Sequence, residues 1–111
     1  MDSILNSVKK VVGLGETYTP FDPDIIMHIN TTFFVLNQLG VGPEKPLVIE
    51  DASTTWDAFD STGEMEAVKT YVGLKVRLLF DPPSNSSLLN AIKENIAEYE
   101  WRLRSAAEIK A

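Results

Sequence analysis

The stretch VRLLFDPPSNSSLL, residues 76–89, decides the fold, because one helix must end inside it and another must begin. Pro82 and Pro83 have no backbone N–H to donate, and each forces the residue before it into extended geometry. A helix that reaches Asp81 therefore ends there. Residues 84–86 read SNS, and all three are good helix-capping residues. We predict a structural corner at Asp81, Pro82 and Pro83 that folds a second helix back along the first.

Both flanks of this corner carry apolar residues at helical spacing. Residues 64–80 predict a central helix that is apolar on two sides, and the residues after 86 predict a helix with a heptad-like seam. One apolar face of the first is Met65, Val68, Val72, Val76 and Leu79, and the seam of the second is Leu89, Ile92, Ile96, Tyr99 and Leu103. Gly73 weakens the central helix by about 1 kcal/mol relative to alanine, which indicates the close approach of another backbone.

The N-terminal half predicts two further helices. Residues 2–13 show apolar side chains at helical spacing. Residues 22–40 begin with Asp22 as the expected cap, followed by a proline that suits a first helical turn. This second segment is apolar on more than one side, so we expect Met27 and Phe34 to be buried.

Residues 44–51 change character, because prolines interrupt a short apolar run. Leu47, Val48 and Ile49 predict a short strand or an extended arm that is mobile or edge-exposed in the isolated chain and is offered to a neighbouring subunit. The whole pattern predicts a single, mainly α domain over residues 1–111. We expect a small bundle of about four helices, with a short irregular or β-like insertion and a Pro-Pro helical corner.

The composition is that of an ordinary soluble domain. The chain has 111 residues, of which 44% are hydrophobic and 23% charged, and it has no cysteine. The missing cysteines remove disulfides, thiol catalysis and thiolate metal sites. The formal net charge of −6 argues against wrapping DNA, because phosphate binding depends on Lys and Arg. No apolar run approaches the ~20 residues of a membrane span, and the N-terminus is too polar for a signal peptide, so we expect a cytosolic origin.

Few residues suggest chemistry. His28 has Asp24 one helical turn before it, and a His–Asp pair can act as an acid–base unit, but no nucleophile motif accompanies it. Glu94 and Glu98 lie one turn apart and could contribute to a magnesium site, although Glu98 has Arg102 as a ready ion-pair partner. We therefore predict no catalytic residue, no cofactor and no metal site.

Trp101 does not fit a purely structural interpretation. It falls nearly opposite the apolar seam of the last helix, and a large aromatic residue on a polar face usually marks a partner surface. Arg102 and Arg104 flank the same face, and Arg104 is expected to pair with Glu100. We therefore place Trp101, Arg102 and Arg104 in a candidate subunit or partner interface, together with the arm at residues 47–49. The alternative is that Ile4, Leu5 and Val8 of the same chain cover the Trp101 ring.

The chain resembles the small head–tail connector proteins of long-tailed bacteriophages. The resemblance covers about residues 2–108, and its most specific parts are KTYVGLKVRLLFDPP at 69–83 and EYEWRL at 98–103. It implies a mostly helical, non-enzymatic structural protein of the virion, located at the head–tail junction after assembly in the bacterial host cytoplasm. The expected partners are the portal protein and a head-closure or tail-completion protein.

The resemblance also implies that copies of the chain form a homo-oligomeric ring, with the twelvefold symmetry of the portal, either before or only upon contact with it. DNA would pass through its centre as a transient, non-specific contact. Two other classes of function remain open at this point: a magnesium-dependent helical nucleotide pyrophosphohydrolase, and a small dimeric helical regulator.

Overall fold

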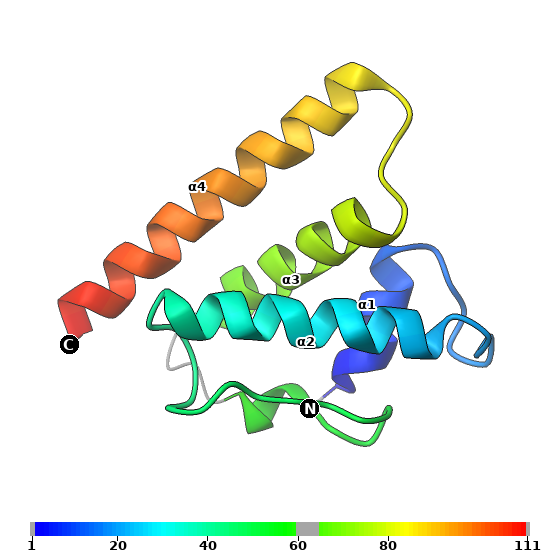
Figure 1. Ribbon diagram of the computed structural model, residues 1–111, viewed down its shortest axis with the longest axis horizontal. Coiled ribbons are helices and arrows are strands. Elements are labelled where there is room, and N and C mark those ends of the chain that lie inside the picture. The colour runs from blue at the N-terminus through cyan, green and yellow to red at the C-terminus, as the bar shows by residue number, and fades with distance from the viewer. Residues whose placement is uncertain (1, 60–64, 111) are drawn as a thin grey trace.

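The computed structural model describes residues 2–59 and 65–110, and within them it contains four α-helices and one 3-10 turn. They are α1 (Ile4–Val11), α2 (Asp22–Gln38), η1 (Trp56–Ala58), α3 (Met65–Phe80) and α4 (Ser86–Lys110). In Figure 1, α2 lies in front of α1 and α3, and α4 runs back along α3. The molecule is a flat plate that measures 40 × 35 × 19 Å. The predicted mainly α fold is confirmed, and the insertion before η1 is irregular.

Helix α1 is fixed by its start and by one buried charge. The Ser3 side chain caps the helix by accepting a hydrogen bond from the Asn6 N–H at 3.3 Å. Lys9 is fully buried, and its Nζ lies 2.8 Å from a carboxylate oxygen of Asp22 and donates to the Glu16 carbonyl at 3.0 Å. A buried ammonium group needs such partners, so this ion pair ties the end of α1 to the start of α2.

Helix α2 begins one residue earlier than predicted. Asp22 is its first residue and Phe21 its N-cap, because the Asp22 carboxylate faces Lys9 instead of capping the backbone. At the other end, Gly40 adopts a φ of +83°, and the next N–H, that of Val41, donates to the Leu36 carbonyl at 2.9 Å. This is the Schellman geometry that a glycine after the last turn permits.

The inner side of α2 is core, but its outer side is not. Ile25, Ile29, Phe33 and Leu36 are buried. The expectation that Met27 and Phe34 are also buried is wrong, since 58% of Met27 and 51% of Phe34 are exposed. No described helix covers this side of α2, so a helix with apolar residues all round leaves one row in solvent.

Helix α3 is the central helix, as predicted, and contacts α1, α2 and α4. A Cβ atom at Gly73 would lie 3.2 Å from both Cγ atoms of Val11. The predicted close approach at this glycine is therefore made by a side chain of α1 and not by another backbone. The absence of a Cβ lets α1 cross α3 at this point.

The end of α3, the start of α4 and the seam of α4 lie close to where the sequence predicts them. The Asp81 N–H makes the last helical bond, to the Arg77 carbonyl at 2.8 Å, and Asn85 caps α4 by accepting from the Leu88 N–H at 3.0 Å. Asp81 and Pro82 are exposed, whereas Pro83 is half-buried. Within the seam, Ile92, Ile96 and Leu103 are buried and Leu89 and Tyr99 half-buried. Together with the view in Figure 1, this confirms the predicted antiparallel hairpin.

One buried hydroxyl changes the expected charge pairing on α4. The Tyr71 hydroxyl of α3 donates to the Glu100 carboxylate at 2.7 Å, and Lys75 lies 3.9 Å from the same oxygen. Burial raises the pKa of Tyr71 above its ordinary value, and the hydrogen bond to Glu100 and its negative charge raise it further. The predicted Glu100–Arg104 pair does not form, because Glu100 turns toward α3.

Two asparagines attach the arm to α2. Asn30 donates to the Ile49 carbonyl at 3.0 Å and accepts from the Ile49 N–H at 2.8 Å. Asn37, two turns along, donates to the carbonyls of Pro43 and Glu44. The predicted edge of a sheet is absent from the described residues, whose only β-type pairing is an isolated bridge between residues 3 and 55. Side chains of α2 therefore hold the arm at Ile49, while Val48 is 65% exposed. The mobility of residues 44–51 in the isolated chain stays a prediction.

Candidate interaction surfaces

Trp101 is a large exposed side chain and defines the first candidate surface. It lies on the C-terminal half of α4, and 67% of it is exposed. The seam of α4 faces α3, so the helix presents Trp101 away from its own core. Ile4, Leu5 and Val8, which could have covered the ring, are fully buried in the core, and Trp101 remains in solvent. The alternative that Trp101 is a core residue is therefore wrong.

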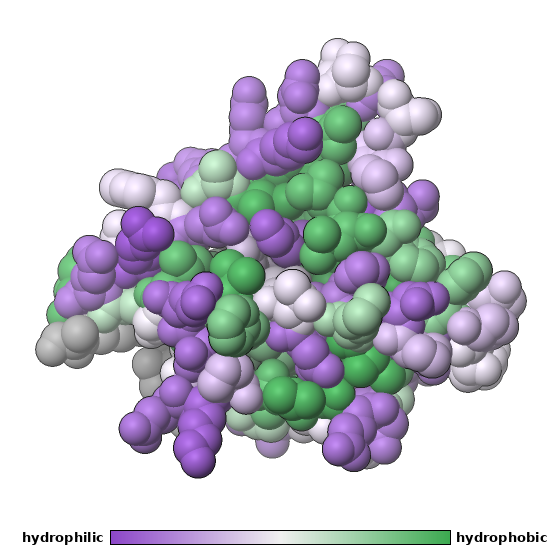
Figure 2. Space-filling model, in the orientation of Figure 1, coloured by the Kyte–Doolittle hydropathy of each residue, from purple (hydrophilic) through white to green (hydrophobic). Residues whose placement is uncertain are grey.

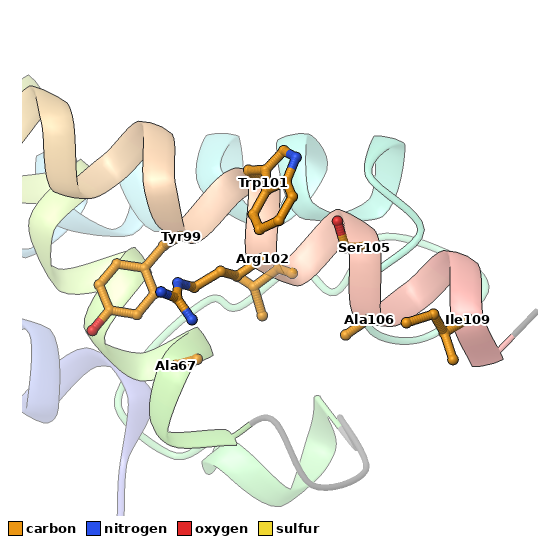
Figure 3. A pocket seen from close by; sticks show the side chains of 8 residues that line it. Ala67, Tyr99, Trp101, Arg102, Ser105, Ala106 and Ile109 are labelled. Carbon is orange, nitrogen blue, oxygen red and sulfur yellow. The ribbon is translucent and has the colours of Figure 1, made fainter.

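A groove runs beside Trp101 between α4 and the start of α3. It encloses about 500 Å³ and is lined by Ala67, Tyr99, Trp101, Arg102, Leu103, Ser105, Ala106 and Ile109. Figure 3 shows Trp101 rising on one side of α4, with Ala67 on the opposite wall and the short side chains of Ser105 and Ala106 between Trp101 and Ile109. Ile109 is 86% exposed. We call this surface the α4 groove.

The two arginines beside the α4 groove differ in their ion pairing. Arg102 is exposed but engaged, because its guanidinium donates to Glu98 at 3.0 Å, which confirms that predicted pair. Arg104 is also exposed and has no carboxylate within ion-pair distance among the described residues. The aromatic anchor thus has one neutralised and one available arginine next to it in sequence.

The second exposed surface lies on α2. Met27, Thr31 and Phe34 form its outer row. Val48 of the arm is 65% exposed and directly precedes Ile49, the residue that Asn30 holds. We call these four residues the α2 face. Figure 2 looks onto the side of the plate that α2 occupies and shows apolar side chains both over α2 and below it.

The three arm residues of the candidate interface differ in how far they are buried. Val48 points outward, Leu47 is half-buried, and Ile49 is 1% exposed. Ile49 is thus a core residue of its own chain and is not on the outer surface, which corrects its assignment. The burial of Ile49 could not be predicted from this short apolar run, because the partner that fixes the arm is a side chain of α2.

The residues considered for chemistry do not come together. His28 is half-buried and its ring centre lies 6.4 Å from that of Phe80. Among residues 2–59 and 65–110, no three His, Asp or Glu side chains lie close enough to hold a metal ion. Glu64, which with Glu66 opens the predicted central helix and is a further candidate carboxylate, lies outside the described residues. Within the same part of the chain, no helix has the length and apolar character needed to cross a bilayer.

The fold and its surfaces define a small helical protein whose prominent exposed features are apolar anchors on helix faces. Such surfaces are typical of proteins that assemble with other chains. The model of the family described as phage connector proteins matches residues 4–110, and the chain belongs to this family. Searches of the curated proteins and of the solved structures gave no match.

This membership confirms the resemblance seen in the sequence. The family is one of structural proteins, and it places the chain among the proteins that connect parts of a phage particle. This membership implies interaction with phage head or tail proteins and a place in the virion.

Proposed function

We propose that the protein forms a ring between the portal and the tail-completion or head-closure proteins of a phage, and that the DNA passes through the centre of this ring. Membership of the connector family supports the location. The proposed assembly takes place in the host cytoplasm before the particle is complete. The net charge of −6 suits a channel through which DNA must slide, since an acidic wall repels phosphates.

The exposed Trp101 carries this proposal. Trp101 is 67% exposed, and arginines follow it one and three positions later, so the residue types that dominate binding energy at interfaces stand together here. Its helix already buries Ile92, Ile96 and Leu103 in the core, so folding of the chain does not require the indole of Trp101. Binding to a partner explains why the chain carries an exposed tryptophan at this position.

The test is Trp101→Ala, measured both for folding and for assembly. Because Trp101 is mostly exposed, we expect the unfolding free energy to change by less than about 1 kcal/mol. Truncating an interface anchor costs roughly 2 kcal/mol or more, so attachment to purified portal should weaken about 30-fold or more. Leu88→Ala is the matched control, since Leu88 is an exposed apolar residue at the other end of α4.

Both measurements are needed for a decision. Wild-type portal affinity and normal particles with Trp101→Ala would refute the role of this residue. Loss of portal attachment with Leu88→Ala to the same extent would show that the effect is not specific to Trp101. Electron microscopy of the wild-type protein with portal tests the ring itself: bound material without rotational symmetry would refute it.

A further inference from the structure

The two apolar surfaces lie on opposite sides of a thin plate. In Figure 1 the α2 helix lies toward the viewer, whereas in Figure 3, which looks into the α4 groove, α2 lies behind α4. The plate is only 19 Å thick, and its broad sides measure 40 × 35 Å. Each side is large enough for the roughly 800 Å² that one partner contributes to a standard interface. One chain thus offers two different surfaces, one on each side.

The two surfaces have matching spacing. Met27 and Phe34 are seven residues apart, which places them about 10.5 Å apart along α2. Trp101 and Ile109 are eight residues apart, or about 12 Å along α4. Each pair of large side chains has a smaller residue midway, Thr31 on α2 and Ser105 on α4. Large side chains of one helix can therefore pack beside the small residues of the other, as ridges pack into grooves.

One set of charges on the two surfaces is also complementary. Helix α2 has no Lys or Arg, and Asp24 stands exposed one turn before Met27. The arm next to it adds exposed acids at Glu50 and Asp51. On the other surface, Arg104 is exposed without an ion-pair partner among the described residues. The acidic rim of one surface suits the arginine of the other.

We propose that the occupant of the α4 groove is the α2 face of a second copy of this chain. The contact is heterologous, because each copy uses a different surface on each side, and such contacts close into a ring when the rotation permits. This inference rests on the proposed ring and specifies which two surfaces build it. Contact between two α4 grooves, or with portal alone, is the competing arrangement.

Cysteine cross-linking tests the pairing directly, because the chain contains no cysteine of its own. Thr31→Cys lies midway along the α2 row, and Ser105→Cys lies midway between the anchors of the α4 groove. The two midpoints meet whether the helices cross parallel or antiparallel, and all four large anchors remain in place. The variants are mixed, bound to wild-type portal, oxidised and analysed by mass spectrometry of the disulfide-linked peptides.

We expect the mixed Thr31→Cys/Ser105→Cys disulfide to exceed either homodimer at least 10-fold. A Leu88→Cys protein, with its thiol at the far end of α4, should give no such enrichment with Thr31→Cys. A dominant Ser105→Cys homodimer would overturn the pairing in favour of groove-to-groove contact. Portal-bound protein without the mixed disulfide would overturn the pairing while leaving the connector function intact. Failure of the wild-type protein to bind portal would instead count against the proposed function.

Discussion

Replacing Asn30 by alanine should detach the arm from α2. The Asn30 amide bonds both the N–H and the carbonyl of Ile49, at 2.8 and 3.0 Å, as a neighbouring strand would. Ile49 is buried beside this pair, so water does not replace the lost partners freely. Asn30→Ala therefore removes two hydrogen bonds and leaves two backbone groups poorly satisfied.

The expected loss follows from these two bonds. A typical intramolecular hydrogen bond contributes about 1 kcal/mol net, and an unsatisfied buried group costs more. We expect Asn30→Ala to lower the unfolding free energy by about 2–3 kcal/mol. At about 4 °C per kcal/mol for a domain of this size, Tm should fall by about 8–12 °C.

The assay is thermal and urea unfolding of the isolated chain, together with hydrogen exchange at the Ile49 amide. Asn37→Ala is the matched control, because Asn37 also bonds the arm but only through two carbonyls nearer the surface. It should cost about 1 kcal/mol or less. If Asn30→Ala stays within about 0.5 kcal/mol of wild type and Ile49 keeps its protection, the asparagine does not hold the arm.

Three further predictions concern the helices. Changing both prolines at residues 82–83 to alanine should lower stability by about 1–2 kcal/mol in urea unfolding, because the unfolded chain gains freedom and α3 can run on; an unchanged midpoint contradicts this. Tyr71→Phe should cost about 1–2 kcal/mol at neutral pH through the lost bond to Glu100. The pKa of Tyr71 is raised in the folded state, so its contribution to the unfolding free energy is complete below the unfolded pKa of about 10 and is lost as pH rises above it. Tyr71→Phe should therefore lose stability less steeply than wild type above pH 10. Equal slopes would argue against a buried phenol. Gly73→Ala should be stabilising by up to about 1 kcal/mol only when Val11 is also alanine, which a double-mutant cycle of unfolding free energies measures.

Local patterns were sufficient for the helices and the corner. The bounds of α3, the stop at Asp81 and the seam of α4 follow from apolar periodicity, proline chemistry and capping, all of which act within a few residues. The exposure of Trp101 was also predictable as one of two outcomes, because the angle around α4 places it opposite the seam. Local rules could not decide whether another part of the chain covers it.

The errors occurred where a distant residue competes with a local one. Glu100 has Arg104 one turn away, but its carboxylate accepts a hydrogen bond from the Tyr71 hydroxyl, which is buried and needs an acceptor. The local sequence also gives no sign that Lys9 is buried, because its partner Asp22 belongs to the next helix. Met27 and Phe34 read as core because an apolar side chain on an all-round apolar helix does not reveal which row is covered. Each case depends on tertiary contacts that sequence periodicity does not contain.

The exposed apolar side chains of α2 and α4 are not needed for folding, because both helices already bury another face in the core. Helix α2 buries Ile25, Ile29, Phe33 and Leu36, and α4 buries most of its seam. Neither helix therefore needs Phe34 or Trp101 to fold. Large apolar side chains in solvent promote non-specific association, a tendency that a net charge of −6 opposes. A subunit that must contact neighbours on two sides needs such anchors on both sides, together with enough repulsion to keep random encounters short. The plate carries both features, and in the ring that we propose the same acidic charge repels the DNA phosphates.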